Sequence, residues 1–431
     1  MNNKANMHNW GLYPKQEVQA HHPHSLHDVQ QVLGHEANLI ARGNGRCYGD
    51  SSLGDTVVSM LHLNRFLSFD EKAGVLHCEA GVLLDDVLKL IVPKGFFLPV
   101  SPGTKFITVG GALASDIHGK NHHVDGVFSD HVLSFTILDA NGTLIEVFPD
   151  DPLFDQTAGG MGLTGIIYSV TFSLKRIETS YMKVTQYKAR NLENIFSLFA
   201  QHPDPTYSVA WIDCLAGGKS FGRSILMMGE HAKASEISKP QPLKLHKVPG
   251  LNIPIHFPSW ALNRWSVKAF NTLYYNKPGI REGKPQIIHY DSYFYPLDSI
   301  HHWNRIYGKR GFTQYQCVLP PDVSFEGISE MLGLMQKSGQ ASFLAVLKLF
   351  GKAHEDRYLH FPMEGYTLAV DFQVNDKVFA MLDRFDAIVR ELGGKVYLTK
   401  DARMSAETFK ALYPQRLEAR RFRSAQAERL R

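Results

Sequence analysis

The first quarter of the chain alternates short stretches of helical and strand periodicity. Within residues 24–98, SLHDVQQVLGHE predicts a helix with Ser25 as its N-cap, and the ANLIARG that follows predicts a buried strand. VLHCEAGVLLDDVLKLIVPKG then predicts a strand, a turn and an amphipathic helix that ends at Pro93 and Gly95. This alternation is typical of an α/β or α+β fold.

Strand patterns dominate the rest of the chain. Over residues 100–175 two runs, HVLSFTILDANGTLIEVFP and LTGIIYSVTFSLKRI, have strand patterning, and Asn141-Gly142 in the first run is a hairpin signal. Over residues 181–394, strand runs that include QIIHYDSYFYP, FTQYQCVLPP and YTLAVDFQV are interleaved with helical patterns. They predict an antiparallel sheet with helices on one side, and hence an α+β fold.

Composition limits the classes of protein. A chain of 431 residues with 44% hydrophobic residues can bury a core for two or three domains. Lys and Arg exceed Asp and Glu by only four, which argues against a nucleic-acid partner and still suits an anionic small substrate or an anionic membrane surface. The four cysteines form no CxxC pair, so we expect neither a zinc site nor a disulfide framework. With no apolar stretch near 18 residues, we expect a cytoplasmic protein with at most peripheral membrane contact.

Three glycine-rich turns carry the candidate chemistry. The first, RGNGRCYGD, starts at Arg42 directly after a predicted strand, and its glycines let backbone amides approach a pyrophosphate. The second comprises SPGT at 101–104 and TVGGALASDIHG at 108–119, and the third is GGMGLTGII from Gly159. Each could be only a turn or a small-residue helix. Together, within 125 residues, they indicate one extended cofactor.

A histidine cluster raises the question of a metal. His118 and His122 have the His-x3-His spacing that can share one helix face, with His123 beside them, but Gly119, Lys120 and Asn121 interrupt a helix. No carboxylate or thiolate lies nearby in the sequence to complete a site. We therefore expect no metal.

The three turns, in this order, resemble the FAD-binding domain of the vanillyl-alcohol oxidase and p-cresol methylhydroxylase flavoproteins. Within that superfamily, the strings VGGALASDIHGKNHH, WNRIYGKRGFTQYQ and KVYLTKDARMSAETFKALYP resemble the family of decaprenylphosphoryl-β-D-ribose 2′-oxidases over nearly the whole chain. The resemblance implies a two-lobed FAD-binding domain over residues 1–178, split near residue 99. It also implies a substrate domain over 179–394 and a C-terminal segment, 395–431, that returns to the FAD domain.

The resemblance also implies the residues that bind FAD. Arg46 stands where many relatives have a histidine bonded to the flavin, so noncovalent FAD is expected, with Arg46 free to pair with phosphate. The implied cofactor residues are Ala41, Arg42, Gly43, Asn44, Gly45, Arg46, Cys47, Tyr48, Gly49, Asp50, Ser51, Gly103, Thr108, Val109, Gly110, Gly111, Ser115, Asp116, Ile117, His118, Ile166, Ile167 and Tyr397.

The implied reaction is oxidation of the 2′-hydroxyl of a polyprenyl-phosphoryl ribose to the 2′-keto form, by hydride transfer to flavin N5. The hydroxyl proton then needs an acceptor. His118 has an ordinary pKa near 6.5, whereas Lys400 must be desolvated to act as a base. We favour His118 narrowly; Lys400 could instead hold the substrate, or form a surface salt bridge with Asp401.

The substrate residues follow from the resemblance and the strand pattern. Gln314 and Gln316 alternate on a predicted strand and therefore share a face. Lys348 lies in the apolar run FLAVLKLF, where it either binds a substrate phosphate or is an edge-strand lysine in water. Tyr48 either packs near the flavin and substrate or fills its loop.

Two departures from the family qualify the resemblance. The family has a cysteine where this chain has Ala369, so inhibitors that capture that thiol should fail here. The tail after Tyr413-Pro414 is shorter than is usual in the family, which predicts a looser closure of the FAD site.

Two other functions remain open. One is an aldonolactone or alditol oxidase that passes electrons to oxygen, and the other is a non-catalytic flavin-binding partner protein. The resemblance further implies an NAD-dependent ketoreductase that completes a 2′-epimerisation in cell-wall polysaccharide biosynthesis.

Overall fold

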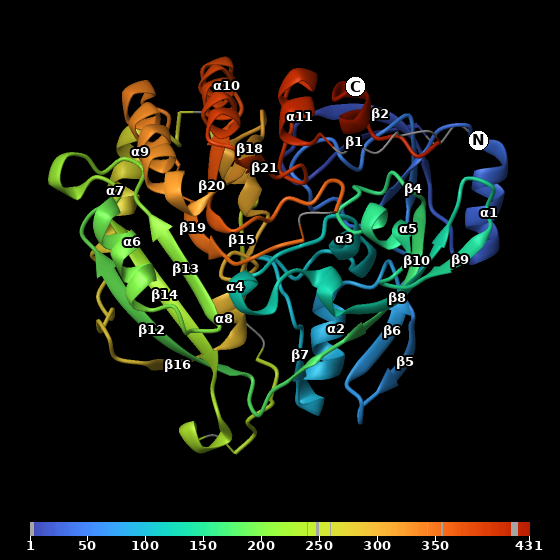
Figure 1. The fold of residues 1–431 in the computed structure, drawn as a ribbon, viewed down its shortest axis with the longest axis horizontal. Helices are drawn as coiled ribbons and strands as arrows, with labels where there is room; N and C mark the ends of the chain where they lie inside the picture. The colour runs from blue at the N-terminus through green and yellow to red at the C-terminus, as the bar shows by residue number, and fades with distance from the viewer. Residues whose placement is uncertain are drawn as a thin grey trace.

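The computed structural model describes residues 4–238, 240–246, 250–258, 260–342, 344–354, 357–414 and 421–431. Sheets of four, five and eight strands and two two-stranded sheets organise these residues, with helices packed against them (Figure 1). The predicted α+β class is confirmed.

The first sheet has four strands in the order β1-β2-β4-β3 and carries the first glycine-rich turn at its β3 edge. Helix α1 covers it, and Ser25 caps that helix through its side chain, as predicted. The elements are β1 Lys4–His8, β2 Lys15–His21, α1 Leu26–His35, β3 Ile40–Arg42 and β4 Thr56–Ser59.

The second sheet has five strands in the order β5-β6-β10-β8-β9. The predicted hairpin joins β8 to β9, with Gly142 at φ +80°, a conformation that glycine adopts without strain. Its elements are β5 Phe66–Asp70, β6 Val75–Glu79, α2 Leu84–Ile91, α3 Val109–Ala114, α4 His122–Asp125, β8 Val132–Leu138, β9 Leu144–Val147, α5 Pro152–Thr157 and β10 Ile166–Ser173. The short β7 Phe96–Phe97 pairs with β11 Lys175–Arg176.

The third sheet has eight strands in the order β16-β12-β14-β13-β19-β20-β18-β21, and its neighbouring strands are antiparallel, as predicted. Its strands are β12 Tyr181–Ala189, β13 Tyr207–Ile212, β14 Ser224–His231, β16 Gln286–His289, β18 Phe312–Leu319, β19 Ala345–Phe350, β20 Gly365–Gln373 and β21 Lys395–Val396. The parallel pair β15 Leu251–Asn252 and β17 Ile300–His301 lies apart from it.

Helices cover one face of this large sheet (Figure 1). Side chains of α6 Leu192–Gln201, α9 Pro321–Ser338 and α10 Asp376–Glu391 pack with alternate strand residues into one apolar core. Each fully buried leucine or phenylalanine there contributes about 1.5–3 kcal/mol to folding. The opposite face is left free to form a binding site.

One predicted strand is wrong in part. The segment QIIHYDSYFYP is a strand only over Gln286–His289, and helix α8 Tyr290–Phe294 follows. His289 begins this helix because its side chain accepts a hydrogen bond from the Asp291 amide. Tyr290, Tyr293 and Phe294 have the i, i+3, i+4 spacing of a helix face, and all three are buried.

The C-terminal segment contacts both parts of the chain. Strand β21 extends the large sheet, and the Tyr48 amide then donates to the Thr399 carbonyl over 3.0 Å. Helices α11 Ala406–Leu412 and α12 Ala425–Arg429 follow, and Arg429 forms ion pairs with Asp50 and Asp401. These contacts hold the end of the chain against the first glycine-rich turn.

The longest helix in the described ranges is α9, and neither it nor any other described helix has the length and apolar composition needed to cross a bilayer.

Candidate active site

A cavity of about 920 Å³ lies between the free face of the large sheet and the glycine-rich turns. Gln314 and Gln316 of β18 and Lys348 of β19 line it, because alternate strand residues share a face. Ala369, which replaces the family cysteine, lies on the same face opposite Gln316. The volume is in the range of cofactor and substrate sites, roughly 300–1,000 Å³.

The three glycine-rich turns border this one space. A Cβ added to Gly43 in the first turn would lie 2.2 Å from Thr108 Oγ1 in the second, so these two turns are in contact. Gly162 and Gly165 of the third turn line the same cavity. The close packing explains the small residues: a Cβ on Gly110 would meet the Ala80 Cβ at 2.7 Å.

Two observations show that the wall of the cavity formed by the glycine-rich turns fits FAD. A Cβ added to Gly103 would have no heavy atom within 4 Å, so the backbone there borders open cavity that a flat ligand can approach. Arg46 stacks on Trp10 at 4.0 Å and on Phe106 at 5.2 Å, and it has no ion-pair partner in the described part of the chain. An anionic pyrophosphate would complement this half-buried cation.

Most of the expected cofactor residues line the cavity. They are Ala41, Arg42, Gly43, Asn44, Gly45, Arg46, Cys47, Tyr48, Ser51, Gly103, Thr108, Gly110, Gly111, Ser115, Ile117, His118, Ile167 and Tyr397.

Five expected cofactor residues lie elsewhere, and packing explains each. Val109 and Ile166 are fully buried in apolar cores. Gly49 packs against the C-terminal segment, where a Cβ would lie 1.8 Å from the Asp401 carbonyl oxygen. Asp50 pairs with Arg429, and Asp116 faces away into a polar network.

His118 is buried where the second glycine-rich segment meets the sheet. Gln316 Nε2 donates to His118 Nε2 over 2.9 Å, and the ring packs on Phe350 and Tyr397. Burial, and then the positive charge of Lys348, lower the pKa of His118 well below 6.5. The imidazole is therefore neutral at pH 7 and already accepts one hydrogen bond.

Four lysines line the cavity, and one of them, Lys277, lies in the turn after helix α7 Arg264–Tyr275. Burial lowers the pKa of Lys348 to about 7 and the pKa values of Lys120 and Lys400 to about 8. Lys120 donates to the Phe294 carbonyl over 3.1 Å, whereas Lys348 has no hydrogen bond or ion pair among the described residues. Lys348 projects from an inner strand, so the edge-strand alternative is wrong. An anionic ligand would stabilise the charged form of this buried amine.

Lys400 lies over the ring of Tyr48, with its Nζ 4.0 Å from the ring centroid. The nearby Asp371 is fully buried and accepts hydrogen bonds from Gln314 Nε2 at 2.5 Å and Tyr307 Oη at 3.4 Å. Burial raises the pKa of Asp371, and the charge of Lys400 opposes this rise. This end of the cavity thus holds cations, amides and one buried carboxyl group.

The alternative pairing of Lys400 with Asp401 is wrong. Asp401 forms its ion pair with Arg429 at 2.9 Å and also accepts hydrogen bonds from the amides of Arg403 and Met404. Lys400 points to the cavity instead.

The cavity continues as an apolar arm across the strands at the other end of the sheet. The arm ends at the turn 277–280 after helix α7 Arg264–Tyr275, where Pro278 and Gly279 are exposed, so it opens at the surface there. Its apolar lining residues are Val184, Val209, Trp211, Met227, Tyr274 and Ile288, and Gln186 and Gln286 also line the cavity from β12 and β16.

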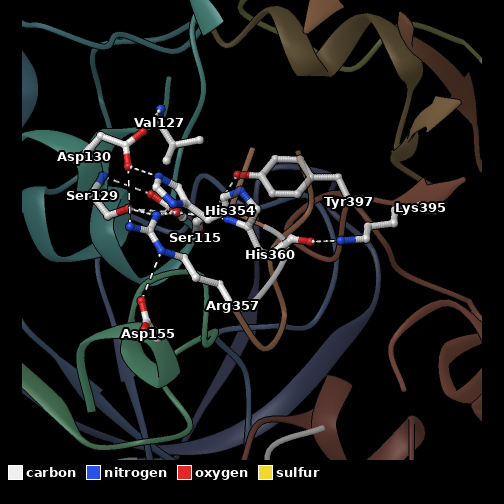
Figure 2. A network of polar contacts seen from close by, with 11 residues as sticks. Ser115, Val127, Ser129, Asp130, Asp155, His354, Arg357, His360, Lys395 and Tyr397 are labelled. Atoms are coloured by element: carbon white, nitrogen blue, oxygen red, sulfur yellow. Dashed lines mark hydrogen bonds and ion pairs between the residues drawn. The ribbon is translucent and has the colours of Figure 1, made fainter. Parts of the chain in front are cut away.

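A polar network ties the connection between β19 and β20 to the loop that carries His118 (Figure 2). Arg357, in the connection between β19 and β20, lies 3.3 Å from a carboxylate oxygen of Asp116 and donates to Ser129 Oγ over 2.5 Å. It also contacts Asp130 and Asp155.

Asp116 is the centre of this network. It has a positive φ of 37° and accepts hydrogen bonds from the Ser129 amide and hydroxyl, both at 3.0 Å. His360 Nδ1 lies 3.2 Å from Asp116 Oδ2, the oxygen that Arg357 also faces. Next to it, the Ser115 carbonyl accepts from Tyr397 Oη at 2.8 Å. The network therefore holds the backbone on both sides of Asp116 in place.

Sequence analysis missed several of these residues. Lys120 stands inside the motif HGKNHH, and Asp371 stands beside the Ala369 substitution, so both had a local signal. Trp211 and Arg357 had no such local signal, because nothing in their surrounding sequence distinguishes them from ordinary core or surface residues.

Comparison with known proteins identifies the family. A family model described as an FAD binding domain matches residues 14–147. The chain is 39% identical over 386 residues to the decaprenylphosphoryl-beta-D-ribose oxidase of Mycolicibacterium smegmatis, over 87% of this chain and 83% of that protein. It is 26% identical over 198 residues to the L-gulonolactone oxidase of Mus musculus, over 43% of this chain and 44% of that protein.

A solved structure, Physcomitrella patens BBE-like 1, has the same fold, with a TM-score of 0.65 at 17% identity over 94% of this chain and 87% of that one. The FAD-binding wall and these relatives make the protein an FAD-dependent oxidoreductase that acts on alcohol groups. The chain belongs to the decaprenylphosphoryl-beta-D-ribose oxidase family.

Proposed function

We propose that this protein oxidises the 2′-hydroxyl of a polyprenyl-phosphoryl ribose to the 2′-keto form. The relative from Mycolicibacterium smegmatis carries the name of an oxidase for a decaprenylphosphoryl ribose. The observation that carries the proposal is the shape of the cavity, in which a cluster of lysines leads directly into the apolar arm. A lipid-linked sugar phosphate has the same sequence of polar, anionic and apolar parts.

The residues divide between the parts of such a substrate. The amides of Gln314 and Gln316 would bind sugar hydroxyls, because each amide offers both a donor and an acceptor. Lys348, which lacks a protein partner among the described residues, would bind the phosphate together with Lys120. The apolar arm would hold the first isoprene units.

Bound FAD supplies the two-electron acceptor for the oxidation. The cofactor would be noncovalent, with Arg46 beside its pyrophosphate and Tyr397 close to its ring. The backbone at Gly103 would lie against the ligand, because a side chain there would extend into the cavity.

The proton of the hydroxyl group needs a base, and we favour Lys400 over His118. The pKa of Lys400, lowered to about 8, is close to neutral pH, where a general base is most effective. His118 has a pKa well below 6.5 and a ring nitrogen that already accepts from Gln316, so it binds a proton weakly. His118 would hold Gln316 in position instead.

The spectrum of the purified holoenzyme tests the proposal. Under anaerobic conditions a polyprenyl-phosphoryl ribose should bleach the flavin absorbance, whereas free ribose at the same concentration should not. Peroxide formation in air with a free aldonolactone or alditol would support the alternative oxidase. A flavin that no alcohol reduces would indicate a non-catalytic binding protein.

The product of this reaction is a 2′-ketone. A 2′-epimerisation requires its reduction from the opposite face, so an NAD-dependent ketoreductase is the proposed partner. The purified pair should convert the ribose lipid to its 2′-epimer, and the oxidase alone should not.

A further inference from the structure

Helix α7 turns an apolar stripe toward solvent. Trp265, Ala269 and Leu273 are four residues apart and therefore share one face of the helix. Trp265 is 76% exposed and Leu273 is 73% exposed. A surface helix of a globular protein usually buries its apolar stripe, so this orientation needs an explanation.

Buried contacts hold the helix in this orientation. Asn271 is fully buried and donates to Asp213 Oδ1 over 2.8 Å, and Val267 is buried on the same side. Tyr274 packs on Trp211 with ring centroids 4.8 Å apart. Rotating the stripe inward would break these contacts, so the outward apolar face is a stable property of the fold.

The apolar surface extends beyond the stripe. Phe270 is 44% exposed, and Trp260, in the turn that Asn263 caps, is 75% exposed. We call Trp260, Trp265, Phe270 and Leu273 the α7 patch. Figure 1 shows α7 on the flank of the molecule that also carries α6 and α9.

Exposed cations lie on helix α7 and in the segment that follows it. Arg264 and Lys268 on α7, and Arg281 and Lys284 after it, are all exposed. Glu282 is the acidic residue among them, and its side chain accepts the Lys188 amide at 2.9 Å. Tryptophan beside lysine and arginine is typical of surfaces that lie in the headgroup region of an anionic bilayer. Aromatic residues and arginine are also enriched in protein–protein interfaces, but lysine is depleted there, so Lys268 and Lys284 favour the lipid surface.

We propose that the α7 patch docks this protein on an anionic lipid surface. The C-terminal end of the same helix forms the mouth of the apolar arm, through Tyr274 and the turn 277–280. Docking therefore brings the mouth of the arm to the bilayer, where a lipid-linked substrate can enter without crossing water. The docking itself goes beyond the proposed function, because it requires no substrate.

The intrinsic fluorescence of the holoenzyme provides a direct test. Of the five tryptophans, Trp211 and Trp303 are buried and Trp10 is partly buried, so a blue shift on binding would come from Trp260 and Trp265. Vesicles of phosphatidylcholine mixed with phosphatidylglycerol should cause this shift and carry the protein in flotation. Vesicles of phosphatidylcholine alone should bind it more weakly.

Variants make the test specific. Trp265→Gln with Leu273→Gln should weaken partitioning at least about tenfold, because two large apolar side chains leave the bilayer. Lys268→Glu should weaken binding to the anionic vesicles by about fivefold or more. Phe148→Gln, at an apolar residue that is 46% exposed and distant in sequence, is the matched control and should bind like the parent.

Three outcomes would overturn the proposal: no partitioning into anionic vesicles, equal partitioning of the patch variants and the parent, or self-association that the same variants abolish without any lipid binding. Flavin reduction by a water-soluble, short-chain phosphoryl ribose tests the proposed function independently of lipid docking. The patch variants should keep that rate and lose rate only with a long-chain substrate in vesicles.

Discussion

Replacing Arg357 with methionine should loosen the loop that carries His118. The substitution leaves Asp116, which is almost fully buried, without its guanidinium partner at 3.3 Å. Removing one partner of a buried ion pair costs about 3–5 kcal/mol. Asp116 keeps its two hydrogen bonds from Ser129, and His360 Nδ1 remains 3.2 Å from its carboxylate. We therefore take about 3 kcal/mol, the lower end of that range.

The other ion-pair partners of Arg357 add little to this free-energy penalty. Asp130 and Asp155 have carboxylates that are 24% and 43% exposed, so each lost pair is worth under about 1 kcal/mol. The loss is local, because the connection between β19 and β20 can detach without global unfolding. A penalty of about 3 kcal/mol corresponds to a roughly 100-fold larger open fraction of the loop.

Native-state hydrogen exchange of the holoenzyme, read on peptides spanning residues 112–130, measures this open fraction. The Ser129 amide should lose its protection most clearly, because it donates to Asp116. Asp155→Asn is the control and should change exchange only slightly. Asp116→Asn combined with Arg357→Met should show less loss than the sum of the two single variants, since the buried charge is gone.

The effect should depend on pH. In the parent, His360 and Arg357 hold the pKa of Asp116 below its ordinary value against the effect of burial. This carboxylate therefore stabilises the fold above the unfolded pKa, and that contribution is lost as the pH falls through the folded pKa. Without Arg357 the pKa of Asp116 rises, so the penalty should be full at pH 7 and shrink in acid. Unchanged exchange in Arg357→Met, or a penalty that grows in acid, would refute this reasoning.

Three further predictions concern the cavity. Lys348→Met should raise the KM for the phosphorylated substrate about 10- to 100-fold in steady-state assays, because a charge-assisted contact is lost; an unchanged KM would exclude a phosphate there. In the parent, kcat/KM should rise with pH through about 8 as Lys400 loses its proton, and Lys400→Met should lower kcat and remove this rise. A rise that persists in the variant would exclude Lys400 as the base. Gly103→Leu should weaken FAD binding in fluorescence titrations, because the new side chain enters the cavity, and normal affinity would separate Gly103 from the cofactor.

Local signals were sufficient for much of the fold. The Ser25 cap, the Asn141-Gly142 hairpin and the shared face of Gln314 and Gln316 follow from short-range rules, since hydrogen bonding and side-chain direction repeat over a few residues. The segment after His289 was misassigned because its aromatic residues suit a strand and a helix equally, and only burial against the rest of the molecule selects the helix.

By itself, the sequence determined the α+β class, the three glycine-rich turns and the family whose cofactor they bind. Only the tertiary structure decided which side chains meet. Arg357 and Asp116 are 241 positions apart, and no local pattern links them. The stripe on α7 has the spacing of a core-facing helix, yet Asn271 and Asp213 turn it outward. Periodicity reports which residues share a face, but the packing of distant segments decides what that face contacts.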